Sequence, residues 1–292
     1  SPFPKRNPEM GKGIDNLRYR EMEVEEGVYL PDYDVEYPED DPGKHIVGVK
    51  YDGSDVKLDG SFPYLDDSRH YKLHHFLNRL ARVFLVQPLN RIRYGLKIVG
   101  KENLKPFKTA LADGAMTVCN HVYRWDLVCI TQAIGMKNLW FPIFGEHMKG
   151  KDMWFMRYAG GIPIPEERSG MRPFNEAFDE LHRRRQWIHV FPEASSWRFY
   201  APIRPFRTGA FTMAYKYGMP VVPCVITYRP RTGLYKLTEK PDVPLLTLHI
   251  GVPIIPDLTV PRKKEVERIL KEAHSQMVKM AGIKKNPWPA ME

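Results

Sequence analysis

The sequence predicts an α/β layered fold, in which a central mixed, largely parallel sheet is flanked by helices and preceded by an acidic N-terminal extension. From about residue 70 onward, short apolar stretches alternate with stretches of helical periodicity, the pattern of a buried sheet covered by helices. The length of 292 residues allows one sizeable domain with an extension. A hydrophobic content of 43% and a charged content of 27% exclude wholesale disorder, collagen and coiled coil.

Residues 1–66 are predicted to form an acidic N-terminal arm, and residues 67–292 the functional domain. The arm holds 8 Lys and Arg against 16 Asp and Glu, whereas the rest of the chain holds 36 against 19. Within residues 1–44, apolar side chains come singly among prolines and acids, which indicates an extended arm, partly ordered at best. Apolar residues on both sides of Asp52-Gly53 predict a β-hairpin within residues 45–64. We expect the acidic arm to pack across the basic domain.

The formal net charge of +9 predicts an anionic partner. Nucleic acid, an acidic lipid surface and a phosphorylated substrate all fit that charge. Three cysteines are too few for a disulfide framework and favour a reducing compartment. No run of about 18 uncharged apolar residues predicts a membrane-spanning helix, and no signal peptide is visible.

Apolar residues recur at helical spacing between residues 73 and 84, with basic residues between them. This helix either lies in a lipid interface, or is an ordinary helix packed on the core with a solvated basic face. The pattern alone favours the second interpretation. The same choice between interface and core is open for a set of aromatic residues further along: Trp140, Phe141, Phe144, Trp154, Phe155 and Tyr158.

The remaining elements alternate along the chain. Strands are predicted over residues 115–119, 161–164, 187–191, 221–228 and 245–250, which are short and apolar. Helices are predicted over residues 127–134, 174–185, 211–217 and 261–282, where apolar residues follow a helical period. Pro192 halts one strand, Gly218 and Gly282 end two helices, and Pro261 opens the last helix.

The strongest local signal is Asn120-His121 with Asp126 five residues beyond the histidine, directly after a predicted strand. On a continuous helix this spacing would leave the two side chains roughly 140° apart, so they would not meet. They meet if His121 lies in the strand-to-helix turn and Asp126 in the first helical turn, with Asn120 tying the turn together. The carboxylate then holds one imidazole nitrogen, and the other can take a proton from a hydroxyl.

Two nearby features offer competing interpretations. His147 and Asp152 repeat the spacing, but they follow no clear apolar strand and are interpreted as a loop and a helix start. Cys119 lies two residues from His121 and must be considered as a nucleophile. A small apolar cysteine inside a strand is the simpler interpretation.

Further charged residues follow two other predicted strands. Glu193 lies just past a strand, at the same carboxyl edge as His121, where open α/β sheets bind ligands. Gly161 opens an apolar segment that leads to Arg168. Three more arginines cluster after the glutamate: Arg198, Arg204 and Arg207. An arginine can hold a phosphate with two parallel hydrogen bonds, although any one of these is also compatible with a solvated surface charge.

The order of these motifs resembles the four-block signature of the glycerolipid acyltransferases. This is the lysophosphatidic acid acyltransferase superfamily, which also contains glycerol-3-phosphate acyltransferases and tafazzin. The resemblance covers about residues 75–255. Its blocks are Asn120-His121-x4-Asp126 (HX4D), Gly161–Ile164 leading to Arg168, Phe191-Pro192-Glu193, and Val221-Val222-Pro223. Residues 67–292 are thus identified as an acyltransferase domain.

The resemblance implies an O-acyltransferase that moves a fatty acyl group from acyl-CoA or acyl carrier protein to a hydroxyl of a lysophospholipid. The default acceptor is lysophosphatidic acid and the product phosphatidic acid. His121 would be the general base and Asp126 would orient it. The implied substrate-binding residues are Arg168, Glu193, Arg198 and Arg207, and the implied supporting residues are Asn120 and Gly161. No metal and no cofactor apart from the acyl donor are implied.

Two blocks depart from the family pattern and leave the acceptor open. The third block usually continues Gly-Thr-Arg after the glutamate, and here it reads Ala194-Ser195-Ser196. The second block has Pro163 and Pro165, where an aromatic and a polar residue are common. Glycerol 3-phosphate, another lysolipid or another hydroxyl compound therefore remain alternative acceptors. A non-catalytic protein that binds anionic membranes and a hydrolase acting on esters or thioesters remain alternative functions.

The implied substrates place the protein at a membrane. A lysolipid and an acyl chain partition into bilayers, so the predicted location is peripheral, at the cytoplasmic face of a phospholipid membrane. Basic residues near anionic lipid contribute about 1 kcal/mol each to such binding. Since no nucleic-acid motif is recognisable, nucleic acid is not a predicted partner.

Overall fold

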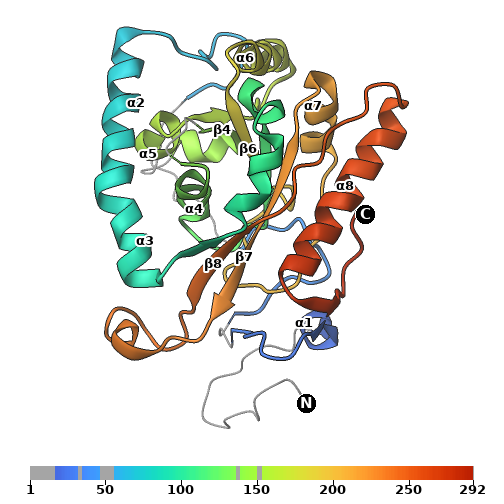
Figure 1. Cartoon of the computed structure of the whole chain (residues 1–292). Coiled ribbons are helices and arrows are strands. Elements are labelled where there is room, and N and C mark those ends of the chain that lie inside the picture. The colour runs from blue at the N-terminus through green and yellow to red at the C-terminus, as the bar shows by residue number, and fades with distance from the viewer. Residues whose placement is uncertain (1–16, 32–34, 47–55, 136–138, 150–152, 292) are drawn as a thin grey trace.

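A computed structural model describes residues 17–31, 35–46, 56–135, 139–149 and 153–291. Within this part of the chain, a seven-stranded sheet has the order β2-β8-β7-β3-β6-β4-β5 (Figure 1). The strands are β2 (Lys97–Val99), β3 (Met116–Cys119), β4 (Leu139–Ile143), β5 (Gly161–Pro163), β6 (Trp187–Val190), β7 (Val221–Arg229) and β8 (Leu245–Ile250). All neighbouring pairs are parallel except β7 and β8. The predicted central sheet, mixed and largely parallel, is confirmed.

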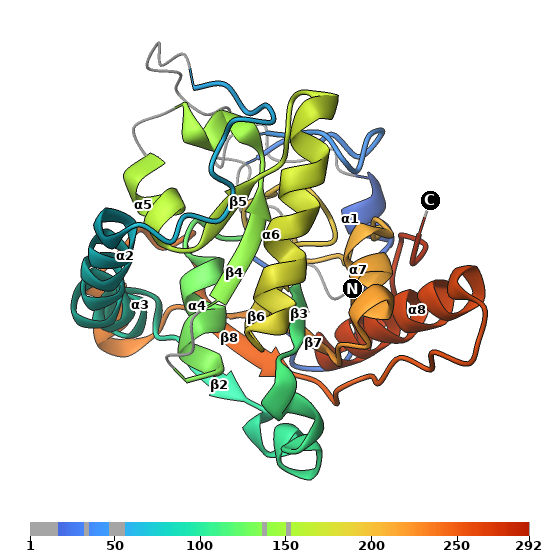
Figure 2. The same cartoon turned by 90° about the horizontal axis from the view of Figure 1, so that it is seen from above.

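Helices cover both faces of this sheet (Figure 2). They are α2 (Arg69–Ala81), α3 (Gln87–Tyr94), α4 (Asp126–Ala133), α5 (Met153–Tyr158), α6 (Met171–Arg183), α7 (Gly209–Tyr217) and α8 (Arg262–Met280). One core cluster joins α6, α7 and α8 to strand residues such as Met116 and Val118. A second joins α4 to Cys119 and Val222. Alternate residues of β3 thus serve opposite faces, as the period of a strand requires.

Strand β4 was not predicted. Its sequence Leu-Trp-Phe-Pro-Ile contains a proline and shows no alternation of polar and apolar residues, so no local strand signal marks it. Within it, Trp140 and Phe141 are buried, which places both in the core. Phe144 and Trp154, from the same set of aromatic residues, are exposed.

The helix predicted over residues 73–84 belongs to a longer unit, in which a π-helical turn (Arg82–Val86) joins α2 to α3. Pro88 has no N–H for the helical ladder, and its ring crowds the carbonyl four residues earlier, which accounts for the widened turn. The unit docks through polar groups: Tyr71 donates to the Arg157 carbonyl at 3.1 Å, and Asn78 to the Phe155 carbonyl at 3.2 Å.

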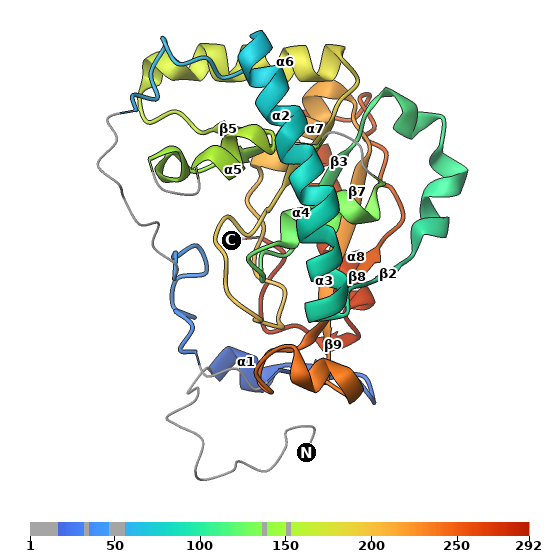
Figure 3. The ribbon, with the colours of Figure 1, turned by 90° about the vertical axis from the view of Figure 1, so that its left-hand side faces the viewer.

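Helices α2 and α3 lie at the outside of the protein (Figure 3), and large apolar side chains along them are exposed. Exposed apolar residues of the unit are Leu73, Phe76, Leu77, Leu80, Phe84, Leu85, Leu89 and Ile92, with Phe84 70% exposed. The favoured interpretation, an ordinary helix packed on the core with a solvated basic face, is therefore wrong. Arg82 is itself buried, and burial lowers its pKa to about 10.

The described part of the acidic arm lies against the domain. It begins with α1 (Leu17–Glu21), and the two-residue β1 (Glu23–Val24) pairs antiparallel with β9 (Ile283–Lys285). Buried aromatic residues join the arm to the domain: Tyr19, Tyr37, Trp197, Tyr200 and Trp288. Residues 47–55 of the predicted hairpin lie outside the described residues, and residues 56–65 contain no strand. No described helix is both long and apolar enough to cross a membrane.

Candidate active site

The turn between β3 and α4 brings His121 and Asp126 together, with His121 Nδ1 2.7 Å from Asp126 Oδ2. The histidine lies in the turn, and the aspartate is the first residue of α4. Asp126 also accepts main-chain N–H bonds from Val122 and Tyr123 on Oδ2 and from Leu127 on Oδ1. The carboxylate is buried and fixed by the backbone of its own turn.

Asn120 fastens this turn to the neighbouring strand. Its Oδ1 accepts the N–H of Ile226 on β7 at 2.8 Å, and its Nδ2 donates to the carbonyl of the same residue at 3.1 Å. The amide thus replaces a main-chain pairing just where β3 ends. Since Asn120 is buried, loss of its side chain would leave both groups of Ile226 without this partner.

The His121 ring stacks on Phe191, with centroids 4.0 Å apart and planes 12° apart. The side chain is 26% exposed, and no described residue contributes a hydrogen-bond partner for Nε2. Because the carboxylate lies at Nδ1, that nitrogen carries the proton in the neutral ring and Nε2 presents a lone pair. This tautomer is assigned from the hydrogen bond.

Glu193 lies behind the histidine. Its Oε2 accepts the main-chain N–H of His121 at 3.1 Å and Arg204 Nη2 at 2.9 Å, and its Oε1 accepts the N–H of Arg204 at 3.0 Å. The residue is 2% exposed. The structure thus brings Glu193 to His121, but both carboxylate oxygens are already occupied, so it is not open to an acceptor head group as the resemblance implied.

Arg204 is a residue at the site that the sequence analysis did not single out, since it was only one of three clustered arginines. It is 1% exposed, forms a buried ion pair with Glu193, and lies under the Trp197 ring, 4.3 Å from guanidinium carbon to centroid. The flanking residues Ile203 and Phe206 are buried as well. Exposed Arg198 also lies between buried apolar residues, Trp197 and Phe199, so the local sequence carries no signal that separates Arg204 from the other arginines.

The other predicted arginines are exposed. Arg198 lies over the Phe199 ring at 5.1 Å, and Arg207 follows the buried loop. Arg168 begins a 3₁₀ turn (Arg168–Gly170) beyond β5. Because β6 and β4 separate β5 from β3, the ends of these two strands lie about 14 Å apart. Arg168 shares no hydrogen bond, ion pair or ring contact with His121 among the described residues.

Gly161 has a packing role at the edge of the sheet. A Cβ atom at this position would lie 2.7 Å from the carbonyl oxygen of Met156, so only glycine allows α5 to approach β5 this closely. Burial raises the pKa of the Cys119 thiol well above its usual value. A buried thiol that stays protonated is not a nucleophile.

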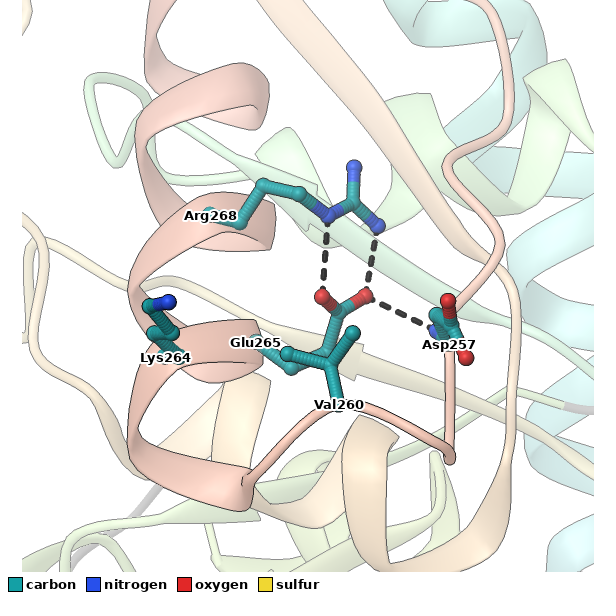
Figure 4. A pocket seen from close by; sticks show the side chains of 5 residues that line it. All are labelled: Asp257, Val260, Lys264, Glu265 and Arg268. Atoms are coloured by element: carbon teal, nitrogen blue, oxygen red, sulfur yellow. Dashed lines mark hydrogen bonds and ion pairs between the residues drawn. The ribbon is translucent and has the colours of Figure 1, made fainter.

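A pocket of the described structure lies at the start of α8, away from the residues that surround His121. It has a volume of about 500 Å³ and is lined by Asp257, Val260, Lys264, Glu265 and Arg268 (Figure 4). Glu265 pairs with Arg268 at 2.6 Å and accepts the N–H of Asp257 at 2.8 Å, so its carboxylate is occupied within the cluster. The described residues contain no group of three or more His, Cys, Asp or Glu arranged to hold a metal ion.

A strand-turn-helix that presents a histidine held by an aspartate, on a largely parallel α/β sheet, has the form of a general-base site. Residues 95–227 match the family described as Acyltransferase. This match and the relatives described next support the resemblance to the glycerolipid acyltransferase superfamily, the group that contains the lysophosphatidic acid acyltransferases.

Similar proteins carry names from this superfamily. The chain is 28% identical over 172 residues to 1-acyl-sn-glycerol-3-phosphate acyltransferase of Escherichia coli (strain K12), a match covering 56% of this chain and 62% of the relative. It is 28% identical to the chloroplastic enzyme BAT2 of Brassica napus, covering 56% and 45%. A crystal structure of PlsC from Thermotoga maritima is similar with a TM-score of 0.46 and 21% identity, covering 73% and 83%. The matches span less than two thirds of these curated relatives.

Proposed function

We propose that this protein transfers a fatty acyl group from an acyl thioester to a hydroxyl of a lysophospholipid, with lysophosphatidic acid as the default acceptor. One observation carries the proposal: Asp126 holds His121 at Nδ1, while no described residue forms a hydrogen bond with Nε2. The curated relatives are named as 1-acyl-sn-glycerol-3-phosphate acyltransferases, which supports this acceptor. The acyl donor is acyl-CoA or acyl carrier protein.

In the proposed reaction, His121 Nε2 takes the proton of the acceptor hydroxyl as its oxygen attacks the thioester carbonyl carbon. A C–O bond forms, the carbonyl electrons move to oxygen, and the C–S bond then breaks. The thiolate takes the proton back from the imidazolium, so ester and free thiol leave and His121 is restored. Asp126 holds the tautomer and stabilises the imidazolium. The scheme involves no covalent enzyme intermediate, metal or cofactor.

The exposed arginines are the proposed cationic contacts for phosphate groups on the substrates: Arg168, Arg198 and Arg207. Exposure leaves a guanidinium able to bind phosphate with two parallel hydrogen bonds. We do not include Glu193 among them, because its oxygens are occupied. The backbone of Arg207 is tied to the third block, since its N–H donates to the carbonyl of Pro192 at 2.8 Å.

The proposed place of reaction is a membrane surface, with the protein bound peripherally at the cytoplasmic face. The apolar side of α2 and α3 supports this, since large residues such as Phe84 and Leu85 are about two-thirds exposed. An apolar face on an interfacial helix gains free energy by entering the acyl boundary. On the opposite side, hydrogen bonds from Tyr71 and Asn78 to main-chain carbonyls hold the unit to the domain.

The test is release of thiol from acyl-CoA in the presence of lysophosphatidic acid. His121→Ala and Asp126→Asn should each lower kcat by at least about 100-fold. The matched control is His147→Ala, in the second histidine-aspartate pair, which should retain the wild-type rate. Equal rates for His121→Ala and wild type would contradict the role of His121.

The same assay separates the alternatives. Thiol release that needs no acceptor would indicate a hydrolase, and salt-sensitive vesicle binding without turnover would indicate a non-catalytic membrane binder. Mass spectrometry of the products from a panel of lysolipids and glycerol 3-phosphate identifies the acceptor.

A further inference from the structure

A segment of the acidic arm, residues 35–46, lies across the loop that follows the third block, residues 193–204. We name this segment the strap. The strap precedes residues 95–227, the part that matches the family, and so lies outside the matched region. Its contacts nevertheless reach the surroundings of His121.

Hydrogen bonds tie the strap to the loop at intervals along its length. The Tyr37 hydroxyl donates to the Arg198 carbonyl at 2.6 Å, and the Tyr200 hydroxyl donates to Glu39 Oε1 at 2.8 Å. The Trp197 indole N–H donates to the Lys44 carbonyl at 2.9 Å. The Tyr37 ring also stacks on Trp197 and meets Tyr200 edge-on, so the strap is anchored by buried aromatic contacts as well.

One strap contact leads directly to the histidine. The Pro42 carbonyl accepts Arg204 Nη1 at 2.7 Å, and Arg204 Nη2 donates to Glu193 Oε2 at 2.9 Å. Glu193 Oε2 in turn accepts the main-chain N–H of His121 at 3.1 Å. Four groups therefore form a continuous relay from the arm to the backbone of the proposed base.

The relay depends on the strap for physical reasons. A buried ion pair is stable only when its remaining donors and acceptors find partners and water is excluded. The Pro42 carbonyl satisfies one donor of Arg204, and the strap covers the loop that holds Glu193. At the end of the strap, burial lowers the pKa of His45, while the nearby Glu146 carboxylate opposes this and Arg204 acts in the same direction as burial. The strap thus ends beside the site.

We propose that docking of the strap helps to hold the active site in its catalytic geometry. In this proposal Arg204 is a positioning residue that couples strap docking to the placement of His121. This inference rests on the proposed function for its kinetic consequence. Undocking the strap would remove a partner of Arg204, loosen Glu193, and free the N–H of His121. The histidine would then spend less time at the geometry that proton transfer needs.

The test uses the full chain with the double substitution Tyr37→Ala/Glu39→Ala, which removes two strap anchors outside the relay. Peptide-resolved hydrogen exchange should show the main-chain N–H of His121 exchanging about 10-fold faster or more, in line with loss of a hydrogen bond. With acyl-CoA and lysophosphatidic acid, kcat should fall about 10-fold or more, with KM changed less. Tyr215→Ala is the matched control, because Tyr215 also donates to a main-chain carbonyl (Val260, 2.9 Å), but on α7.

A second variant tests the inference if the double substitution does not fold. Arg204→Lys keeps a charge beside Glu193 but loses the fork that reaches both Glu193 and Pro42, and it should shift both readouts in the same direction. Wild-type exchange at His121 or wild-type kcat in the folded variants would overturn the inference. If the wild type transfers no acyl group, the proposed function fails, while the exchange measurement still decides whether the relay exists.

Discussion

His189 and Thr117 lie opposite each other on the parallel strands β6 and β3, with His189 Nδ1 2.9 Å from the threonine hydroxyl. The ring is fully buried, and Nε2 has no hydrogen-bond partner among the described residues. Burial lowers the pKa of His189 to about 3, and the charge of His121 acts in the same direction. The ring also meets Phe191 edge-on at 4.3 Å, on the same aromatic residue that supports His121.

This buried histidine should make the protein sensitive to mild acid. An unfolded histidine titrates near pH 6.5. Between about pH 6.5 and 3 the unfolded chain therefore binds a proton that folded His189 does not, and stability falls as the pH falls. From pH 7 to pH 4 the loss is on the order of 3 kcal/mol. Urea unfolding of wild type and His189→Leu at several pH values measures it.

The substitution His189→Leu should make the free energy of unfolding depend less steeply on pH. His274, whose pKa burial lowers to about 4, contributes a residual slope in both proteins. Identical slopes in wild type and His189→Leu would mean that His189 is solvated in the folded state.

Ala194 holds a backbone conformation that suits glycine. Its φ is +65°, directly after Glu193, where the resembling family usually has glycine. A residue with a Cβ in this left-handed region costs roughly 1–2 kcal/mol, whereas glycine adopts it freely. Ala194→Gly should therefore raise the free energy of unfolding by about 1 kcal/mol, measured as a higher urea midpoint at unchanged m-value.

The control for this change is Ala177→Gly, within α6. There the φ is helical, so the same chemical change should lower stability by about 1 kcal/mol. Destabilisation by both substitutions would show that Ala194 is not strained in this turn.

The exposed apolar side of α2 and α3 should govern membrane binding. Phe84 and Leu85 are 70% and 69% exposed. Burying such side chains in lipid gains roughly 1.5–3 kcal/mol each, so Phe84→Ser/Leu85→Ser should weaken binding to anionic vesicles by about 100-fold. Co-sedimentation with vesicles of phosphatidylcholine and phosphatidylglycerol measures the partition.

Leu258→Ser is the matched control for vesicle binding. Leu258 is 57% exposed and lies four residues before α8. Figure 2 shows α8 on the other side of the sheet from α2 and α3. The variant should bind vesicles as wild type does. An equal loss in both variants would point to a general surface effect rather than to docking through α2 and α3.

Local patterns were sufficient to predict much of the fold and the centre of the site. The β3 turn and the start of α4 follow from an apolar run, an asparagine and a five-residue spacing, all within residues 115–126. The largely parallel sheet follows from alternating elements. Such signals succeed because the forces that create them act between residues close in the chain. Strand β4 was not predicted, because Pro142 and a continuous apolar run give no local period.

Contacts between distant segments were decided only in the folded molecule. Glu193, Arg204 and Pro42 form one buried network, although the strap lies some 150 residues before the loop. Nothing near Arg204 distinguishes a buried partner from a surface charge, because burial depends on which other segments cover it. The helical period of α2 likewise shows that one side is apolar, but not whether protein or solvent meets that side. Sequence determines which side chains a segment presents, and only the packing of all segments determines which of them find partners.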